Sequence, residues 1–209
     1  MKKLSFSAAL LCALLGSSLA NAEGGGRPYV GVDILQSDVK HRFYNRVDEV
    51  DMDGESVDSH KINFGANAGY KMNFDKVFVA PEIFYDHFNS STKDFYYQDP
   101  QYAQDRLEID SRYGAKVNLG YNFCPKPSGF INAGMANVKH NVRWNSQGKS
   151  DGDSKLAMIY GLGLSYALND NWSLRTSYDR QTFNIRYMDN GLRDKVRLDV
   201  VKFGVIYGF

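Results

Sequence analysis

The chain has 209 residues, with 25 basic and 24 acidic side chains that leave a formal net charge of +1. This near balance argues against a nucleic-acid-binding protein, which carries a basic excess, and the length suits one domain better than two. The sequence contains 14 Tyr, 13 Phe and 19 Gly but only 5 Pro, a composition that favours strands over a Leu-rich helical core.

The first 22 residues have the three parts of a secretory signal peptide. Lys2 and Lys3 form a basic start, "LSFSAALLCALLG" is a short apolar stretch, and "ANA" at 20–22 is a small-x-small cleavage site. We therefore expect residues 1–22 to be removed and residues 23–209 to form one exported domain. Cleavage would leave Cys124 as the sole cysteine, which excludes an intramolecular disulfide.

The rest of the chain has no run near the roughly 18 apolar residues of a membrane helix, and it alternates instead. In "LEIDSRYGAKVNLGYNF", residues 107–123, apolar side chains occupy one parity and charged or small ones the other, as in a strand with two different faces. The same pattern predicts eight strands. In chain order they cover 28–36, 61–74, 77–88, 107–123, 130–143, 156–168, 172–179 and 200–209, the fifth with a break in register near Ala136.

The links between these segments alternate in length. Short turns at 73–76, 124–129 and 169–171 separate longer links at 36–60, 88–106, 144–155 and 182–195. Bacterial outer-membrane barrels have short periplasmic turns and long extracellular loops. The sequence therefore predicts an all-β fold, an eight-stranded antiparallel up-and-down transmembrane β-barrel, with both termini on the periplasmic side.

The volume of an eight-stranded barrel decides which face of each strand points inward. Its interior is just wide enough to be filled by side chains, and the large apolar faces would overfill it. We therefore expect the apolar faces to contact lipid, with Gly, Ala, Ser, Asn and charged residues inside. A soluble lipocalin-like barrel is the alternative, and it requires the reverse orientation. The aromatic residues expected at the membrane interfaces are Tyr113, Tyr121, Tyr160, Tyr166 and Trp172.

Charged residues of both signs fall on the expected inner face. A buried charge is costly unless it is paired, so we expect these residues to interlock and to close the lumen. A gated ion path through the barrel is the alternative. The expected network comprises Glu82, Asp86, Asp110, Arg112, Lys116, Arg175, Asp179 and Lys202.

Two of the long links have unusual compositions. In "VDEVDMDGESVDSH", residues 47–60, the spacing of Glu49, Asp51 and Asp53 partly matches a calcium loop, but His60 stands where such a loop has a bidentate Glu. We therefore expect a solvated acidic loop, and neither a metal nor a cofactor. The next link carries aromatic residues that either contact a partner or pack on the barrel rim. They are Phe95, Tyr96, Tyr97 and Tyr102.

The end of the chain resembles a known family. "YGLGLSYALNDNWSLRTSYD" at 160–179, followed by "VKFGVIYGF" at 201–209, is similar to the penultimate hairpin and last strand of the small eight-stranded outer-membrane barrels of the OmpA-like, OmpX-like and opacity-protein superfamily. The resemblance implies a location in the bacterial outer membrane. It also implies that Phe209, with aromatic or apolar residues at alternating positions before it, is the signal read by the barrel-assembly machinery.

We expect a surface protein that displays four extracellular loops and acts in adhesion, in interaction with a host or the environment, or in envelope integrity. Its partners would be the lipid bilayer, lipopolysaccharide and an extracellular protein, with no nucleic acid, and it would be a monomer or a weak oligomer. A low-conductance pore is one alternative function.

The other alternative is a lipid A-modifying acyl hydrolase. Small barrels with that activity use a His and a Ser close together on a membrane-facing strand, with a carboxylate that orients the His. None of the four histidines after residue 22 forms a His-x-Ser pair, so we expect no enzymatic activity. A cluster of His, Ser and acid on the outer wall would favour the hydrolase. The four histidines are His41, His60, His87 and His140.

Overall fold

The structure is a computed structural model that describes residues 26–44, 52–53, 57–58, 62–91, 106–144, 149–186 and 193–209. These residues form eight long strands and two strands of two residues each. The long strands are β1 (Arg27–Tyr44), β4 (Asn63–Phe74), β5 (Val77–Ser91), β6 (Arg106–Asn122), β7 (Pro127–Trp144), β8 (Lys149–Ala167), β9 (Trp172–Arg186) and β10 (Arg193–Gly208). The short strands are β2 (Met52–Asp53) and β3 (Val57–Asp58).

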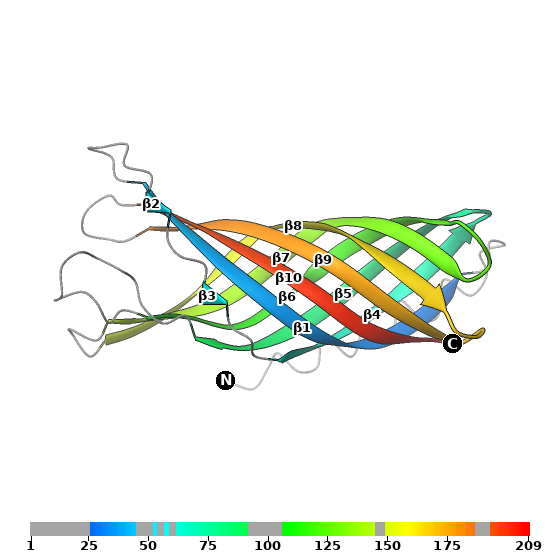
Figure 1. The fold of residues 1–209 in the computed structure, drawn as a ribbon, viewed down its shortest axis with the longest axis horizontal. Coiled ribbons are helices and arrows are strands. Elements are labelled where there is room, and N and C mark those ends of the chain that lie inside the picture. The colour runs from blue at the N-terminus through cyan, green and yellow to red at the C-terminus, as the bar shows by residue number, and fades with distance from the viewer. Residues whose placement is uncertain are drawn as a thin grey trace, which may run out of the picture.

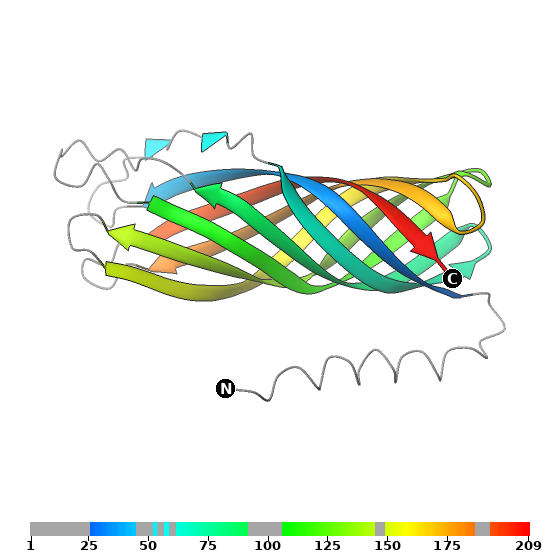
Figure 2. The ribbon, with the colours of Figure 1, turned by 90° about the horizontal axis from the view of Figure 1, so that it is seen from below.

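Each long strand pairs antiparallel with the next long strand along the chain, and β10 returns to pair with β1, so that the sheet closes into a barrel (Figure 1). The closing ladder runs from Tyr29 opposite Gly208 to Tyr44 opposite Arg193. Figure 2 shows the strands inclined to the long axis, as closure of a barrel requires. None of the described residues belongs to a helix long and apolar enough to cross a membrane. The prediction of an eight-stranded antiparallel barrel is confirmed.

Three tight turns join strands at the end of the barrel that also holds the C-terminus, which we call the turn end (Figure 1). Asp75, in the turn between β4 and β5, has a φ of 56°, a conformation that Asp tolerates in a short hairpin turn. In the turn between β8 and β9, the side-chain oxygen of Asn169 accepts hydrogen bonds from the N–H groups of Asn171 and Trp172, at 3.0 and 2.8 Å. Such an Asx turn stabilises a tight reversal of the chain. We call the opposite end of the barrel the loop end.

In the half of the barrel next to the turn end, large apolar side chains point outward. On β6 Val117 and Leu119 are about half exposed, while their sequence neighbours Lys116 and Asn118 are buried. At the turn end the rings of Trp172 and Tyr207 lie 4.9 Å apart, centroid to centroid. A continuous apolar outer wall of this size is stable only when lipid covers it, and aromatic residues are typical of its edges. The predicted orientation of the strand faces is therefore confirmed in this half.

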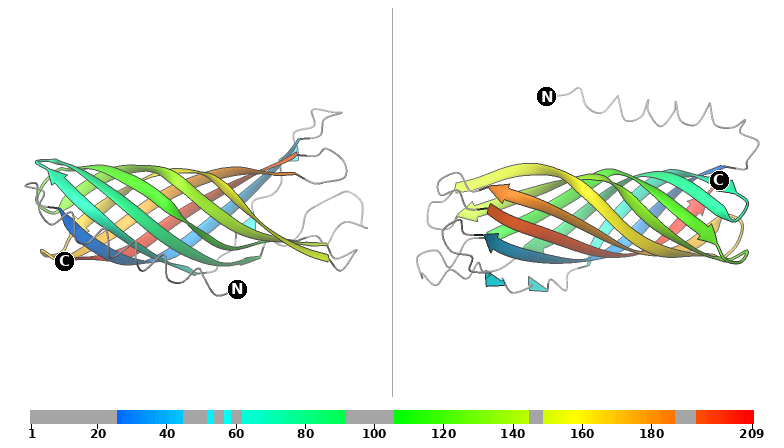
Figure 3. Two further views of the ribbon diagram at one scale, coloured as in Figure 1. Left: turned by 180° about the vertical axis from the view of Figure 1, so that it is seen from behind. Right: turned by 90° about the horizontal axis from the view of Figure 1, so that it is seen from above.

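Toward the loop end the barrel wall divides into two groups of paired strands. The ladder between β8 and β9 ends where Ile159 is opposite Gln181, and the ladder between β1 and β4 ends where Leu35 is opposite Asn63. Beyond these points, among the described residues, β5 to β8 stay paired as one group, and β9, β10 and β1 as the other, with β2 and β3 added to β1. Figure 3 shows the groups diverging at the loop end. This half of the molecule is therefore built like two facing sheets.

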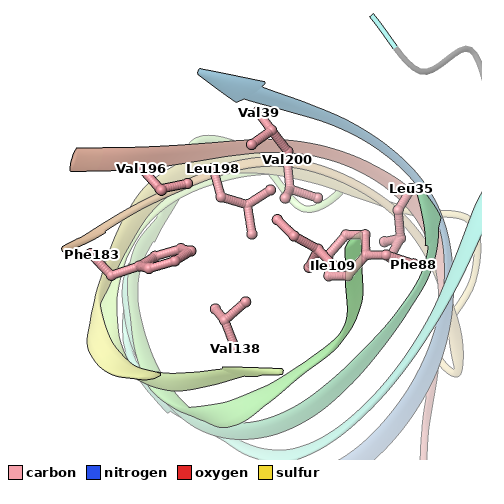
Figure 4. Close-up of a cluster of buried hydrophobic side chains, with 9 residues drawn as sticks. All are labelled: Leu35, Val39, Phe88, Ile109, Val138, Phe183, Val196, Leu198 and Val200. Atoms are coloured by element: carbon pink, nitrogen blue, oxygen red, sulfur yellow. The ribbon is translucent and has the colours of Figure 1, made fainter. Parts of the chain in front are cut away.

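An apolar core, which we call the loop-end core, fills the space between the two groups (Figure 4). It consists of Leu35, Val39, Phe88, Ile109, Val138, Phe183, Val196, Leu198 and Val200. Many of the outward side chains at this level are polar, among them Gln36, Lys139 and Arg197, while Ile62 and Leu156 are apolar residues that also point outward. The polarity of the wall is thus largely inverted relative to the turn-end half, with apolar residues inside and mostly polar residues outside. A barrel wall in contact with water has polar side chains outside and apolar side chains inside. The loop-end half therefore lies outside the lipid.

Two details of the strands differ from the sequence-based prediction. The break in register lies on β6, where the ladder to β7 shifts between Ile109 and Ser111, and not near Ala136 on β7. Ala136 and Val138 both point inward, so the change from polar to apolar inner residues reflects the loop-end core and not a change of face. Several strands also extend further toward the loop end than their alternation indicates, because they continue into the region where outward residues are polar.

Candidate functional site

The lumen of the turn-end half contains a cluster of buried ion pairs. At its centre Asp86 on β5 accepts hydrogen bonds from Nη2 and Nε of Arg112, at 2.6 and 3.0 Å, and from Nζ of Lys202, at 2.6 Å. Asp179 on β9 lies beside them, with its carboxylate 3.1 Å from Nζ of Lys116, and it also accepts a hydrogen bond from the amide of Asn132, at 2.9 Å. Arg112, Asp86 and Asp179 are fully buried. Each carboxylate therefore contacts at least two donors.

A second part of the same network lies nearer the turn end. Glu82 on β5 accepts hydrogen bonds from Nη1 of Arg175, at 2.5 Å, and from the hydroxyl of Tyr29, at 2.8 Å. Nη2 of Arg175 lies 3.5 Å from the carboxylate of Asp33 on β1. Nζ of Lys116 lies 3.6 Å from Glu82 and so links the two parts. The ion pairs therefore form one continuous network that joins β1, β5, β6, β9 and β10 across the lumen.

The ring of Phe84 on β5 stands among the cations of this network. Its centroid lies 4.7 Å from Nζ of Lys202, 5.4 Å from Nζ of Lys116 and 5.4 Å from the guanidinium carbon of Arg112. Cations at such distances from an aromatic ring are attracted by its quadrupole, and more strongly when they are desolvated. Phe84 thus fills space between like charges and stabilises them at the same time.

The network balances its charges. Its four carboxylates are those of Asp33, Glu82, Asp86 and Asp179, and its four cations are Arg112, Lys116, Arg175 and Lys202. All eight side chains are buried. Because desolvated charges are tolerated only when they are paired and hydrogen-bonded, such balance is what a narrow lumen requires. The side chains fill the cross-section of the turn-end half, and the loop-end core fills the other half.

The structure brings seven of the eight expected lumen residues together, and Asp110 is the exception. The shift in register between Ile109 and Ser111 marks a β-bulge, which turns Asp110 away from the network while Arg112 keeps its inward direction. The carboxylate of Asp110 instead accepts a hydrogen bond from the amide of Asn141 on β7, at 2.6 Å. The assignment of Asp110 to the lumen is therefore wrong, and so is that of Ile109 to the outer wall.

Asp33 is the charged residue of the network that sequence reasoning missed. It takes the place expected for Asp110 as the fourth carboxylate, and the amide of Asn67 donates a hydrogen bond to it, at 2.7 Å. A signal for it was present, since Asp33 falls on the inner parity of β1. Its cross-strand neighbour Gly204 also has no side chain that would occupy its space, because a Cβ there would lie 2.0 Å from Oδ1 of Asp33. Tyr29 and Phe84 were missed as well.

Other expected sites lie partly or wholly outside the described residues. This holds for the four aromatic loop residues, Phe95, Tyr96, Tyr97 and Tyr102, and for most of the acidic segment 47–60, of which only β2 and β3 are described. In the part of the chain that is described, no three His, Cys, Asp or Glu side chains come close enough to hold a metal ion. The expectations of no metal and no cofactor remain predictions.

The outer wall places a histidine opposite a serine. His87 on β5 is the cross-strand partner of Ser111 on β6. Within the described residues, however, no hydrogen bond joins the two side chains, and the neighbouring carboxylate of Asp110 is bound by Asn141. A hydrolase triad needs a chain of hydrogen bonds from acid to base to nucleophile. The absence of enzymatic activity stays a prediction.

The closed barrel, its apolar outer belt and its charge-filled lumen together define a small β-barrel that spans a membrane. Residues 7–209 match the family model described as the outer membrane protein beta-barrel domain. The chain belongs to this family and is an outer-membrane β-barrel, as the resemblance of its last strands predicts. No curated protein matches the sequence.

Solved structures with a similar fold are also outer-membrane proteins. The attachment invasion locus protein Ail of Yersinia pestis, solved with the heparin analogue sucrose octasulfate, has 16% sequence identity and a TM-score of 0.51, and the match covers 88% of this chain and 99% of Ail. For the outer membrane protein AlkL the identity is 12% and the TM-score 0.55, with 90% and 92% of the two chains covered. Neisserial surface protein A has 14% identity and a TM-score of 0.50, with 88% and 99% covered. At these identities the likeness concerns the fold alone.

Membership of this family gives the barrel an orientation. In outer-membrane barrels the short turns face the periplasm and the longer loops face outward. The turn end of this barrel is therefore its periplasmic end, and the loop end is its extracellular end. The removal of residues 1–22 remains a prediction, because those residues lie outside the described part of the chain.

Removal of Phe209, or its replacement by lysine, is expected to lower insertion into the outer membrane severalfold. Phe209 is 62% exposed, and its ring contacts that of Tyr207, so its loss removes little of the folded barrel's own packing. The loss should therefore act on assembly more than on stability. Surface abundance in cells measures the first, and unfolding of the refolded protein in detergent measures the second. Equal surface abundance of the two chains would contradict an assembly role.

Proposed function

We propose that the protein is a closed barrel that displays its loops at the cell surface for contact with an extracellular partner. The observation that carries this proposal is the double closure of the interior. The charge network closes the lumen of the turn-end half, and the loop-end core fills the other half. A barrel closed in both halves serves poorly as a conduit, so its function is more readily sought on its outer surface.

The shape of the loop-end half supports the same proposal. Strands that pair beyond the apolar belt, such as β7 with β8 up to Trp144 opposite Lys149, carry the loops away from the membrane. The loop-end core holds these extensions together from inside, as a hydrophobic core holds a soluble domain. Loops attached to a rigid base lose less conformational freedom on binding. The extended strands therefore provide a base on which loops can bind a partner.

The aromatic residues of segment 92–105 are the proposed contacts. Tyr and Phe supply large contact areas with few rotatable bonds, which favours them at protein interfaces. Binding of whole cells to a panel of host and matrix proteins would test their role. We expect at least tenfold weaker binding when these four residues are replaced by serine. The replaced residues are Phe95, Tyr96, Tyr97 and Tyr102.

A matched control keeps this experiment specific. Replacement of Asp48, Glu49, Asp51 and Asp53 by asparagine alters a different loop to a comparable extent and should leave aromatic-dependent binding unchanged. Surface abundance must be equal in all strains. If the serine variant binds every panel protein as strongly as the unmutated chain does, the aromatic loop is not the contact surface.

A further inference from the structure

The turn end of the barrel contains a cavity of ≈ 250 Å³ that lies below the charge network. Its lining includes residues from all eight long strands and from the turn between β8 and β9. Among the described residues that line it, three are cations, namely Arg27, Lys71 and Arg175, and one is acidic, Asp170. The cavity therefore carries an excess of positive charge.

Two of these cations face each other directly. Arg27 on β1 and Lys71 on β4 are cross-strand partners, and both line the cavity. Like charges directly opposite each other destabilise a sheet. Within the described part of the chain neither forms an ion pair with a carboxylate. Nη1 of Arg27 donates to the backbone carbonyl of Asp170, at 3.2 Å, and Nζ of Lys71 lies 4.1 Å from the centroid of the Phe78 ring.

The third cation, Arg175, lines the inner end of the same cavity. Arg175 is 7% exposed, and its two Nη atoms contact Glu82 and Asp33 of the network. Its Nε is buried and has no hydrogen-bond partner among the described residues. Arg175 is neutralised by the carboxylates of the network, whereas Arg27 and Lys71 have no carboxylate partner among the described residues. The two cations that face each other therefore call for an anionic ligand.

We propose that this cavity binds a small oxyanion, a phosphate or a carboxylate, between Arg27 and Lys71. Arg matches the geometry of such oxygens, and Lys supplies a point charge. A volume of ≈ 250 Å³ admits a small ion more readily than a sugar or a peptide. Because the turn end faces the periplasm, the ligand would come from that compartment.

The test is a titration of the refolded full-length barrel in detergent micelles, followed by the NMR shifts of backbone amides around the cavity. Inorganic phosphate and succinate are the probes for the two chemistries, and chloride at equal ionic strength is the reference. We expect one of the two probes to shift the amides of Tyr29 and Asn171 saturably, and the tighter one identifies the ligand class. Failure of both probes, or equal shifts with chloride, would overturn the proposal.

The variant Lys71→Gln should weaken binding of that probe at least tenfold, because it removes one of the two facing charges. Arg27→Gln gives a second, independent test if Lys71→Gln folds poorly. Lys76→Gln is the matched control, since Lys76 lies in an exposed turn at the same end and does not line the cavity. Unchanged affinity in both Lys71→Gln and Arg27→Gln would refute the site.

Discussion

Replacement of Arg112 by alanine is expected to lower the free energy of unfolding by about 3–5 kcal/mol. The guanidinium makes two hydrogen bonds to Asp86 and lies 3.7 Å from Asp179. Without it the network holds one more carboxylate than cation, in a place where water is largely displaced. Unfolding in urea, with the barrel refolded in lipid vesicles, measures the loss.

A double variant separates loss of charge balance from loss of packing. Arg112→Ala combined with Asp86→Ala removes one charge of each sign and restores equal numbers. We expect the double variant to lose less unfolding free energy than the two single variants lose together. The difference should be roughly 0.5–3 kcal/mol, as for other residues in contact. Strictly additive losses would show that the two side chains contribute independently and that pairing is not what holds them.

The same variants decide between a closed barrel and a pore. In planar bilayers the unmutated protein should show little or no steady conductance, because the charge network and the loop-end core each close the lumen. Arg112→Ala should also conduct little, since the loop-end core remains above the altered network. Steady single-channel currents from the unmutated protein, insensitive to changes at Arg112 and Lys116, would favour the low-conductance pore instead.

Replacement of Val117 by arginine is expected to cost about 2–4 kcal/mol in a bilayer, the penalty for a cation on the lipid face near the midplane. Val117 points outward, is 48% exposed, and lies midway along β6 between Tyr113 and Tyr121. Neither lipid nor the lumen offers its charge a partner. Urea unfolding in vesicles gives the change in unfolding free energy.

Gln36→Arg is the matched control for the wall. Gln36 also points outward but lies beyond Ile34, an exposed apolar residue of the belt on β1. Arginine at this level reaches water and the headgroups, so the cost should fall to about 0–1 kcal/mol. Equal costs at Val117 and Gln36 would mean that the apolar belt does not end where the polarity of the wall inverts.

The sequence by itself determined the number of long strands, the kind of turn between them and the face that each strand presents to lipid. These properties are local, because alternation along one strand is visible in that strand alone and turn length is visible between two. The small interior volume of an eight-stranded barrel then decides which face of each strand points inward. This step does not require knowing which strands pair. For the same reason seven of the eight lumen charges could be assigned from parity.

Only the tertiary structure decided which carboxylates complete the network and how the two halves of the barrel differ. Asp33 meets Arg175, 142 residues later in the chain, because β10 closes on β1, and closure is set by the register of all ladders together. Asp110 leaves the lumen because of a bulge that alternation does not reveal. Beyond Ile159 and Gln181 the ladders part into two groups, so apolar residues there, such as Val138, form a core between the groups. The alternation of side chains is a property of one strand. Whether a face of that strand contacts lipid, water or the protein interior depends on the whole barrel.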